Sequence, residues 1–197
     1  IDGDSPGLLL FGAFRKKSQD QPNPFSPPPK VLSKELLRTH AFEYGACHAV
    51  QTFNGTLNSY SLNDDQVGCL SPGMPFGTAF RTVLITGGEL IFQEGTSYPA
   101  EDYLDSWEKL GNLRFDPSNE WVDIVLDYWR GISSALEPGI AVTPFMYRSP
   151  LDLAQSIRGN DLFLDLYDFP EEVDKLVSFC TDWLISFDKF LRDEFPI

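Results

Sequence analysis

The chain has 197 residues, of which 42% are hydrophobic and 14% aromatic. This composition is typical of a globular protein with one substantial core and not of a disordered chain. Its 29 acidic and 15 basic residues give a net charge of −14, which repels phosphate backbones and anionic membrane surfaces. We therefore expect no nucleic-acid partner and no membrane partner, and no apolar run in the sequence reaches the roughly 18 to 20 residues of a membrane span.

Cysteine usage favours a reducing compartment. Cys47, Cys69 and Cys180 are too few and too far apart for a disulfide framework, and none of them belongs to a CxxC pair. We therefore expect the protein to lie in the cytoplasm.

Residues 1–35 predict an irregular arm, because the stretch QPNPFSPPPK is proline-rich and the proline ring prevents regular hydrogen-bonded structure. Residues 36–197 are expected to form the single folded domain. A helix is predicted over residues 33–50, with Ser33 as its N-cap. The Gly-, Asn-, Ser- and Pro-rich residues 52–77 then indicate loops with at most short strands.

The middle of the chain predicts a hairpin and two helices. FRTVLI and ELIFQEG are apolar and β-prone, and Thr86-Gly87-Gly88 between them is a hairpin signal. A short helix is expected over residues 103–111. DPSN, residues 116–119, then caps an amphipathic helix. Its apolar face is predicted to contain Trp121, Ile124, Val125, Tyr128 and Ile132.

The last third begins with a predicted strand and a strongly marked helix start. IAVT, residues 140–143, resembles strands that are buried on both faces of a parallel sheet. Ser149 as N-cap, Pro150 as first helical residue and Asp152 in the first turn mark the start of the helix that follows.

Two more helices are predicted after a turn at residues 158–160. The first is short and runs through Tyr167, and the second is the longest of the chain and begins at Pro170. The apolar stripe of the long helix contains Val173, Leu176, Val177, Cys180, Leu184, Phe187 and Leu191. This order of elements is typical of an α/β protein with crossover connections.

No motif for a metal or for an activated nucleophile is present. His40 and His48 are eight residues apart, so on one helix they lie about 12 Å apart along its axis and cannot share an ion. GxSxG, Walker-type, GxGxxG and HExxH patterns are lacking. Most clustered carboxylates stand at helix starts, where the helix dipole favours anions, so we interpret Asp152, Asp161, Asp165 and Asp168 as capping residues. We assign no catalytic residue and no metal ligand.

The loop after IAVT is the first candidate for ligand contact, because ligands of parallel α/β proteins bind at the carboxyl ends of strands. Tyr147 and Arg148 can hydrogen-bond and pair with an anionic ligand, and Phe145 and Met146 can contact its apolar part. The alternative is that Phe145 and Met146 close the top of a core while Arg148 is solvated. A second, earlier loop adds Ser71, Gly73 and Met74 as weaker candidates.

A long ordered series of segments resembles a known family. LGNLRFDPSNEW, an amphipathic helix, the short strand and SPLDLAQSIRGNDLFLDLYDFPEEVDKLVSFCTDWL are together similar to the uroporphyrinogen decarboxylase-like superfamily, which also contains cobalamin-dependent methyltransferases. Upstream, CLSPGM and GELIFQEGTSYPAEDYLDSW are similar to the turn and the aromatic segment that precede this block in other members. The resemblance covers residues 40–195 and is strongest over residues 110–184.

The resemblance implies a (β/α)8 TIM barrel with its active site at the carboxyl ends of the strands. Such a barrel takes about 250 residues, so we expect these residues to be its amino-terminal half to two thirds. True uroporphyrinogen decarboxylases carry an early Arg-Gln-Ala-Gly-Arg stretch, which residues 1–60 lack. They also have an active-site Tyr at the position where this chain has Gln155 or Ser156.

Because of these departures, the expected activity of the complete protein is methyl transfer through a corrinoid in preference to decarboxylation of a tetrapyrrole. No cofactor is expected within this chain, and zinc and a corrinoid are expected only if the later half of the barrel carries the ligands. The expected partners are a small or tetrapyrrole-linked substrate, a corrinoid protein and a second copy of the chain. A different class of function stays open, namely a non-catalytic barrel subunit or a small-molecule-binding module.

Overall fold

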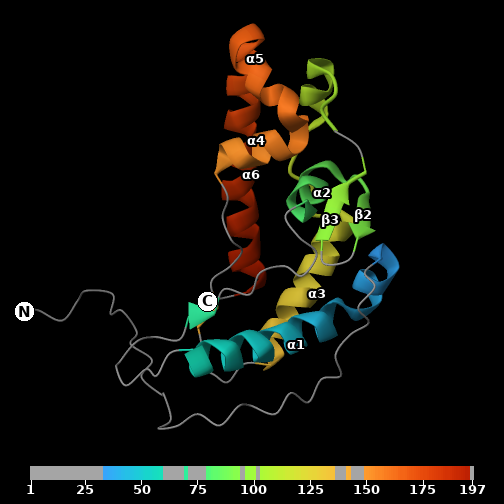
Figure 1. The fold of residues 1–197 in the computed structure, drawn as a ribbon, viewed down its shortest axis with the longest axis vertical. Coiled ribbons are helices and arrows are strands. Elements are labelled where there is room, and N and C mark those ends of the chain that lie inside the picture. Colours follow the sequence, from blue (N-terminus) through green and yellow to red (C-terminus); the bar gives the residue numbers. More distant parts are fainter. Residues whose placement is uncertain are drawn as a thin grey trace, which may run out of the picture. The chain divides into compact units, whose positions relative to one another are not determined.

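The computed structural model describes residues 33–59, 69–70, 79–93, 96–100, 103–135, 141–142 and 149–195. These residues are mostly helical, and their strands form two small two-stranded sheets that do not close a barrel (Figure 1). The chain divides into two compact units. The first contains residues 1–28, 40–73 and 127–145, and the second contains residues 29–39, 74–126 and 146–197. Nearly all of the predicted irregular arm lies outside the described residues.

Helix α1 (Lys34–Ser59) begins where the sequence predicts a helix and extends beyond the predicted end at residue 50. The Ser33 hydroxyl accepts a hydrogen bond from the backbone N–H of Leu36 at 3.1 Å, which confirms Ser33 as the residue that caps the start. The helical backbone is interrupted at His40, whose φ and ψ are −126° and 17°. The chain passes from the second unit to the first at this residue.

In the first unit, α1 crosses α3 (Glu120–Ala135) at a contact between the two backbones (Figure 1). A Cβ atom added to Gly45 would lie 1.9 Å from the carbonyl oxygen of Tyr128, and one added to Gly131 would lie 2.0 Å from that of Phe42. Both positions therefore exclude every side chain, because only glycine lets two helices come this close. The apolar residues around this contact are buried and form a small core. They are Ala41, Tyr44, Ala46, Cys47, Ala49, Val50, Tyr128, Trp129 and Ile132.

The same unit contains a short parallel sheet. Strand β1 (Cys69–Leu70) pairs with β4 (Ala141–Val142), and the register joins Cys69 to Ala141 and Leu70 to Val142. The predicted strand within IAVT is thus confirmed, as is its parallel direction. Parallel strands need a long crossover connection, and α3 lies between these two strands in the sequence.

In the second unit, the predicted strand FRTVLI is instead helix α2 (Phe80–Thr86), so the predicted hairpin is wrong. Every residue from Phe80 to Ile85 is buried, so packing on all sides outweighs the β propensity of the branched residues. Gly87 is the reason that a helix can end here: its φ of 70° is left-handed, and its N–H donates to the carbonyl of Val83. The two glycines therefore mark a helix end and not a hairpin turn.

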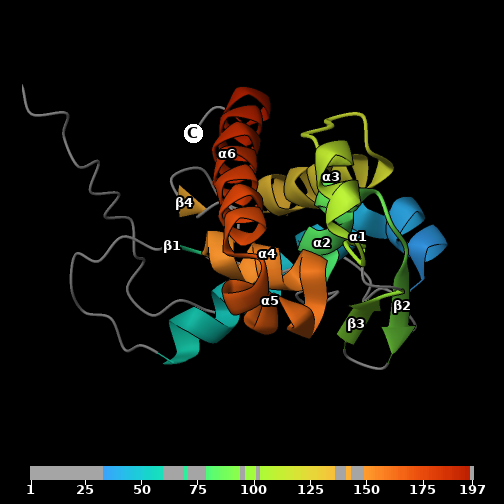
Figure 2. The same ribbon diagram turned by 90° about the horizontal axis from the view of Figure 1, so that it is seen from above.

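The hairpin is formed one segment later. Strands β2 (Leu90–Gln93) and β3 (Thr96–Pro99) pair antiparallel with Gln93 opposite Thr96, and they lie side by side in Figure 2. Leu90 and Ser97 are buried, whereas Ile91 and Tyr98, which are paired across the strands, are half exposed. One face of this hairpin therefore packs against the protein and the other faces solvent.

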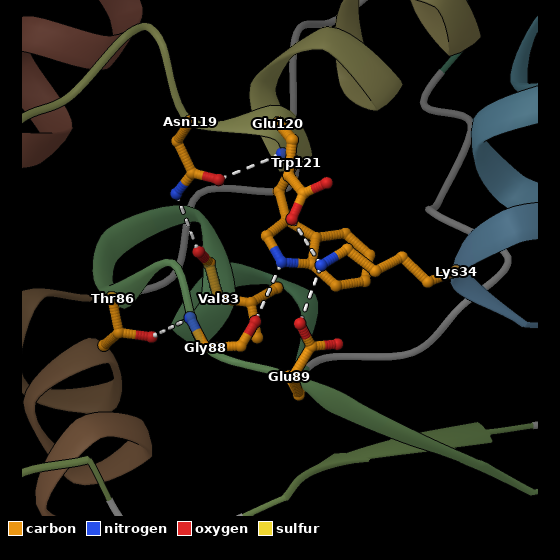
Figure 3. Close-up of polar contacts among 8 residues, drawn as sticks. All are labelled: Lys34, Val83, Thr86, Gly88, Glu89, Asn119, Glu120 and Trp121. Carbon is orange, nitrogen blue, oxygen red and sulfur yellow. Dashed lines mark hydrogen bonds and ion pairs between the residues drawn. The ribbon is translucent and has the colours of Figure 1, made fainter.

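Asn119 joins the end of α2 to the start of α3 (Figure 3). Its side-chain amide donates to the carbonyls of Val83 and Leu84 at 3.0 and 3.2 Å, and its side-chain oxygen accepts from the N–H of Trp121 at 3.0 Å. One side chain thus caps α3 and also donates to two carbonyls at the end of α2, of which the Val83 carbonyl accepts from the Gly87 N–H as well. The predicted capping by residues 116–119 is confirmed for Asn119.

Trp121 and Lys34 extend this connection to the strand that follows α2 (Figure 3). The indole N–H of Trp121 donates to the carbonyl of Gly88 at 2.9 Å. The Lys34 ammonium lies 5.0 Å from the centre of the indole ring and pairs with Glu89 and Glu120. Burial alone would lower the pKa of Lys34, but its hydrogen bonds with Glu120 and Glu89 outweigh that effect and the pKa is raised. The contact between cation and ring adds to these ion pairs.

The predicted helix over residues 103–111 is present as the 3-10 helix η1 (Trp107–Asn112). Helix α4 (Pro150–Arg158) starts as predicted: the Ser149 hydroxyl accepts from Asp152 N, and the Asp152 carboxylate accepts from Ser149 N. This reciprocal arrangement is a capping box, which confirms the capping role of Asp152.

Helix α5 (Leu162–Asp168) follows the 3-10 turn η2 (Gly159–Asp161), and α6 (Pro170–Glu194) ends the described chain. Figures 1 and 2 show α4 and α5 lying against α6. Five residues of the predicted stripe on α6 are buried, and Val177 and Leu184 are half-buried beside them. The buried members are Val173, Leu176, Cys180, Phe187 and Leu191.

We predict that Gly45→Ala destabilises the protein by about 2 kcal/mol. The methyl group gains about 1 kcal/mol of helix propensity, but it meets a backbone carbonyl that cannot move without its helix, and overpacking of this kind costs roughly 1–3 kcal/mol or more. Gly111→Ala is the control, because nothing lies within 4 Å of a Cβ added there. Urea unfolding followed by far-UV circular dichroism measures both, and equal midpoints for the two variants would refute the close contact.

The double role of Asn119 predicts a graded loss of stability. Asn119→Ala removes a cap, worth about 1 kcal/mol, and also removes the donor to the Leu84 carbonyl and the second donor to the Val83 carbonyl, for a total of about 2 kcal/mol. Asn119→Ser keeps a capping oxygen and should lose about half as much. Ser149→Ala, which removes only a cap, is the matched control. A loss for Asn119→Ala no larger than that for Ser149→Ala would show that the bonds to α2 contribute nothing.

Candidate functional site

The seven predicted ligand-contact residues lie outside the residues that the structure describes. They are Ser71, Gly73, Met74, Phe145, Met146, Tyr147 and Arg148. The strands that immediately precede these two groups in the sequence are described. Because β1 and β4 run parallel with Leu70 opposite Val142, both strands end at the same edge of their sheet.

The same unit contains a partly buried pair of polar rings, which comes from α1 and α3. The Nδ1 atom of His48 lies 2.5 Å from the hydroxyl of Tyr128, and the two rings are tilted by 46°. Tyr128 is fully buried, whereas His48 is half-buried. The glycine contact brings the two side chains together: Gly45 lies one helical turn before His48, and it is the Tyr128 carbonyl that packs against Gly45.

Burial keeps both members of this pair neutral. It lowers the pKa of His48 and raises the pKa of Tyr128. The phenol therefore retains its proton at neutral pH and can donate it to Nδ1, in which case Nε2 carries the imidazole proton. A neutral imidazole held in one tautomer by a second group is the arrangement that general acid–base chemistry and polar ligand binding use. Among the described residues, the pair is thus a candidate for polar ligand binding, with both rings neutral.

A buried ion pair joins α4 to α5 in the second unit. Arg158 Nε donates to the Asp165 carboxylate at 2.6 Å, and the two side chains are only 10% and 6% exposed. Another guanidinium nitrogen donates to the carbonyl of Leu104 at 2.6 Å, and the guanidinium lies 5.0 Å from the centre of the Trp107 ring. Asp165 is therefore a partner of Arg158 and not the cap that its place in the first turn of α5 predicts. These contacts assign Arg158 a structural role.

The described residues offer no place for a metal ion, since no three of their His, Cys, Asp or Glu side chains form a group that could hold one. Cys180 is a core thiol, as predicted: it is buried on α6, and burial raises its pKa to about 12. Over the same residues, no helix combines the length and apolar character needed to cross a membrane.

The His48–Tyr128 pair was not predicted. The sequence pattern offers His48 only as a possible metal ligand and Tyr128 only as part of an apolar face. A usable signal was present in GACH and YWRG, because each helix carries a glycine three residues from the polar ring. A glycine inside a helix lowers stability unless another backbone comes close to it.

The pair predicts an acid-sensitive component of stability. His48 has a pKa below 6.5 in the folded protein and about 6.5 when unfolded, so the unfolded state takes up the proton first as pH falls. The part of the folding stability that depends on neutral His48 is therefore complete above about pH 6.5 and decreases below it. As the pH falls from about 7.5 to 5.5, the free energy of unfolding should decrease less for His48→Asn than for the wild type. Asn at this position keeps an acceptor for Tyr128.

Gln51→Asn, exposed on the same helix one turn after His48, is the matched control and should leave the pH dependence unchanged, because neither side chain titrates. Urea unfolding at a series of pH values measures all three proteins. An identical pH dependence for His48→Asn and wild type would show that His48 is not held neutral.

Comparison with known proteins does not place the chain in a family. No protein-family model, no curated protein and no solved structure matches it. A function for this chain can therefore be inferred from the resemblance in the sequence and from the geometry of the described residues.

Proposed function

We propose that the chain is the amino-terminal part of a uroporphyrinogen decarboxylase-like (β/α)8 barrel that acts on a small or tetrapyrrole-linked substrate in the cytoplasm. The observation that carries the proposal is the parallel pairing of β1 with β4, whose connection contains α2, the β2–β3 hairpin, η1 and α3. Neighbouring parallel strands that are joined by a helix-containing crossover are the arrangement that such barrels repeat.

The proposed ligand site is formed by the residues that follow the two paired strands. In a barrel the ligand binds at the carboxyl ends of the strands, and β1 and β4 end at the same edge. Arg148 is proposed to pair with an anionic group of the ligand, a carboxylate or a phosphate, and Tyr147 to donate a hydrogen bond to it. Phe145 and Met146 on one loop and Ser71, Gly73 and Met74 on the other would complete the site.

The residues of α4 favour methyl transfer over decarboxylation. At the position where the family's decarboxylases have an active-site Tyr, the resemblance places Gln155 or Ser156. The Ser156 hydroxyl donates to the Asp152 carbonyl at 2.8 Å, and the Gln155 amide donates to Asn160 at 3.4 Å. Both side chains form hydrogen bonds with residues of α4 or of the turn η2 that follows it, and neither side chain is a phenol.

In the methyl-transfer version of the proposal, zinc would supply a Lewis acid for a thiolate substrate, and a corrinoid protein would supply the methyl carrier. The described residues do not fit a zinc ion, so we assign no zinc ligand and no step at a metal to them. A homodimer is compatible with this proposal. The alternative is a barrel that binds a small molecule without catalysis, and the replacement of the Tyr at residues 155–156 also favours this alternative.

The proposal predicts that the chain binds uroporphyrin or hydroxocobalamin and that binding requires Arg148. Removal of a charged hydrogen-bond partner costs roughly 1.5–3 kcal/mol, so Arg148→Ala should weaken binding about tenfold to hundredfold. Arg148→Lys, which keeps the charge but not the planar fork, should lose less. Arg192→Ala is the control, because that arginine is exposed on α6 and pairs with Asp188.

Fluorescence and absorbance titrations of the four proteins distinguish the outcomes. Arg148-dependent binding of hydroxocobalamin supports the methyl-transfer version, and binding of uroporphyrin alone supports the decarboxylase version. Unchanged binding by Arg148→Ala would refute the proposed site. Failure of the wild-type chain to bind either compound would count against the function itself.

A further inference from the structure

Helix α5 exposes most of its apolar side chains. Its buried residues are Leu162 and Asp165, and the Asp165 carboxylate is held by Arg158. These two positions fix which side of the helix faces the protein. Three large side chains project from the other side: Phe163, Leu164 and Tyr167 are 54%, 67% and 87% exposed. A helix with this distribution has its apolar face directed toward solvent.

The three exposed side chains form one surface. Successive residues of an α-helix are rotated by about 100°, so Phe163, Tyr167 and Leu164 lie within an arc of about 100° opposite the buried side. We call these three residues the α5 surface. Leu166 and Phe169, each 46% exposed, continue the apolar region at its margins. A contiguous exposed patch of this kind, unlike a single exposed leucine, marks an interaction site.

Acidic residues accompany the α5 surface. Asp161 precedes it, Asp168 lies within the same helix, and Glu171 and Asp174 follow in the first turns of α6; all four are exposed. The only lysine or arginine from residue 161 to residue 180 is Lys175. Asp165 does not add to this charge, because Arg158 neutralises it. The α5 surface is therefore apolar, and the exposed charged residues that flank it in the sequence are mostly acidic.

The acidic residues next to the α5 surface indicate which class of partner can bind there. A second copy would bring the same acidic residues against one another, which opposes a symmetric contact. Nucleic acid and anionic membranes are repelled for the same reason. Complementary charge combined with complementary apolar area is found in an amphipathic helix that carries Lys or Arg beside its apolar face.

We propose that the α5 surface docks a basic amphipathic helix of a partner protein. Apolar side chains of that helix would cover Phe163, Leu164 and Tyr167, and its cations would pair with Asp161, Asp168 and Glu171. The docking does not require the function proposed above, because no residue of the proposed ligand site takes part.

A synthetic 14-residue amphipathic peptide of leucine and lysine is the probe, and a peptide with glutamate in place of lysine is its control. Fluorescence anisotropy at near-physiological salt, where weak exposed charge contacts are screened, measures binding to the 197-residue chain. The double variant Leu164→Ser/Tyr167→Ser changes only exposed side chains and should bind the lysine peptide at least tenfold more weakly. Asp168→Asn/Glu171→Gln should weaken binding severalfold and reduce its dependence on salt.

Ile91→Ser and Ile185→Ser are matched controls, because each of these isoleucines is 49% exposed on a different element. Both should bind the lysine peptide as the wild type does. Equal binding by all variants, binding of the glutamate peptide, or absence of binding would overturn the proposal. So would a dimer in analytical ultracentrifugation that Leu164→Ser/Tyr167→Ser abolishes, since a second copy would then cover the surface.

Discussion

The contact between the backbones of α1 and α3 is the constraint that organises the first unit. Gly45 and Gly131 leave no room for a side chain between the two helices, so the distance between their axes is set by main-chain atoms. His48 and Tyr128 meet because of this distance, and burial then keeps both rings neutral. The His48–Tyr128 hydrogen bond thus depends on two glycines, which have no side chain.

Local signals predicted the helices well because the interactions that start and align a helix lie within a few residues. Ser149 and Asp152 cap α4 as their spacing indicates, and the stripe on α6 is buried along the helix. FRTVLI failed because a short apolar run has no period that separates a strand from a helix buried on all sides. The decisive bonds at α2 come from Asn119, more than 30 residues later in the chain.

In the candidate site, too, local patterns were predictable and contacts between distant residues were not. The strand before the predicted ligand residues could be predicted, because IAVT has the composition of a buried parallel strand, and β4 with its parallel partner confirms it. The His48–Tyr128 pair joins residues 80 positions apart, and Asp165 lies in a helix start yet pairs with Arg158. Contacts of this kind arise from packing, so no spacing within either segment encodes them. Tyr147 and Arg148 stay predictions from their place after a strand.

The shared use of Asn119 has a consequence for how the second unit assembles. α2 has seven residues, which is too short to be stable as an isolated helix in water. The Leu84 carbonyl accepts from Asn119, and the Val83 carbonyl gains a second donor, only when the start of α3 is in place, and the cap of α3 forms in the same event. The two helices should therefore appear in one cooperative step, with the intervening hairpin as the loop whose closure entropy must be overcome first. Amide protons of α2 and of the first turn of α3 should then exchange with solvent through a common opening.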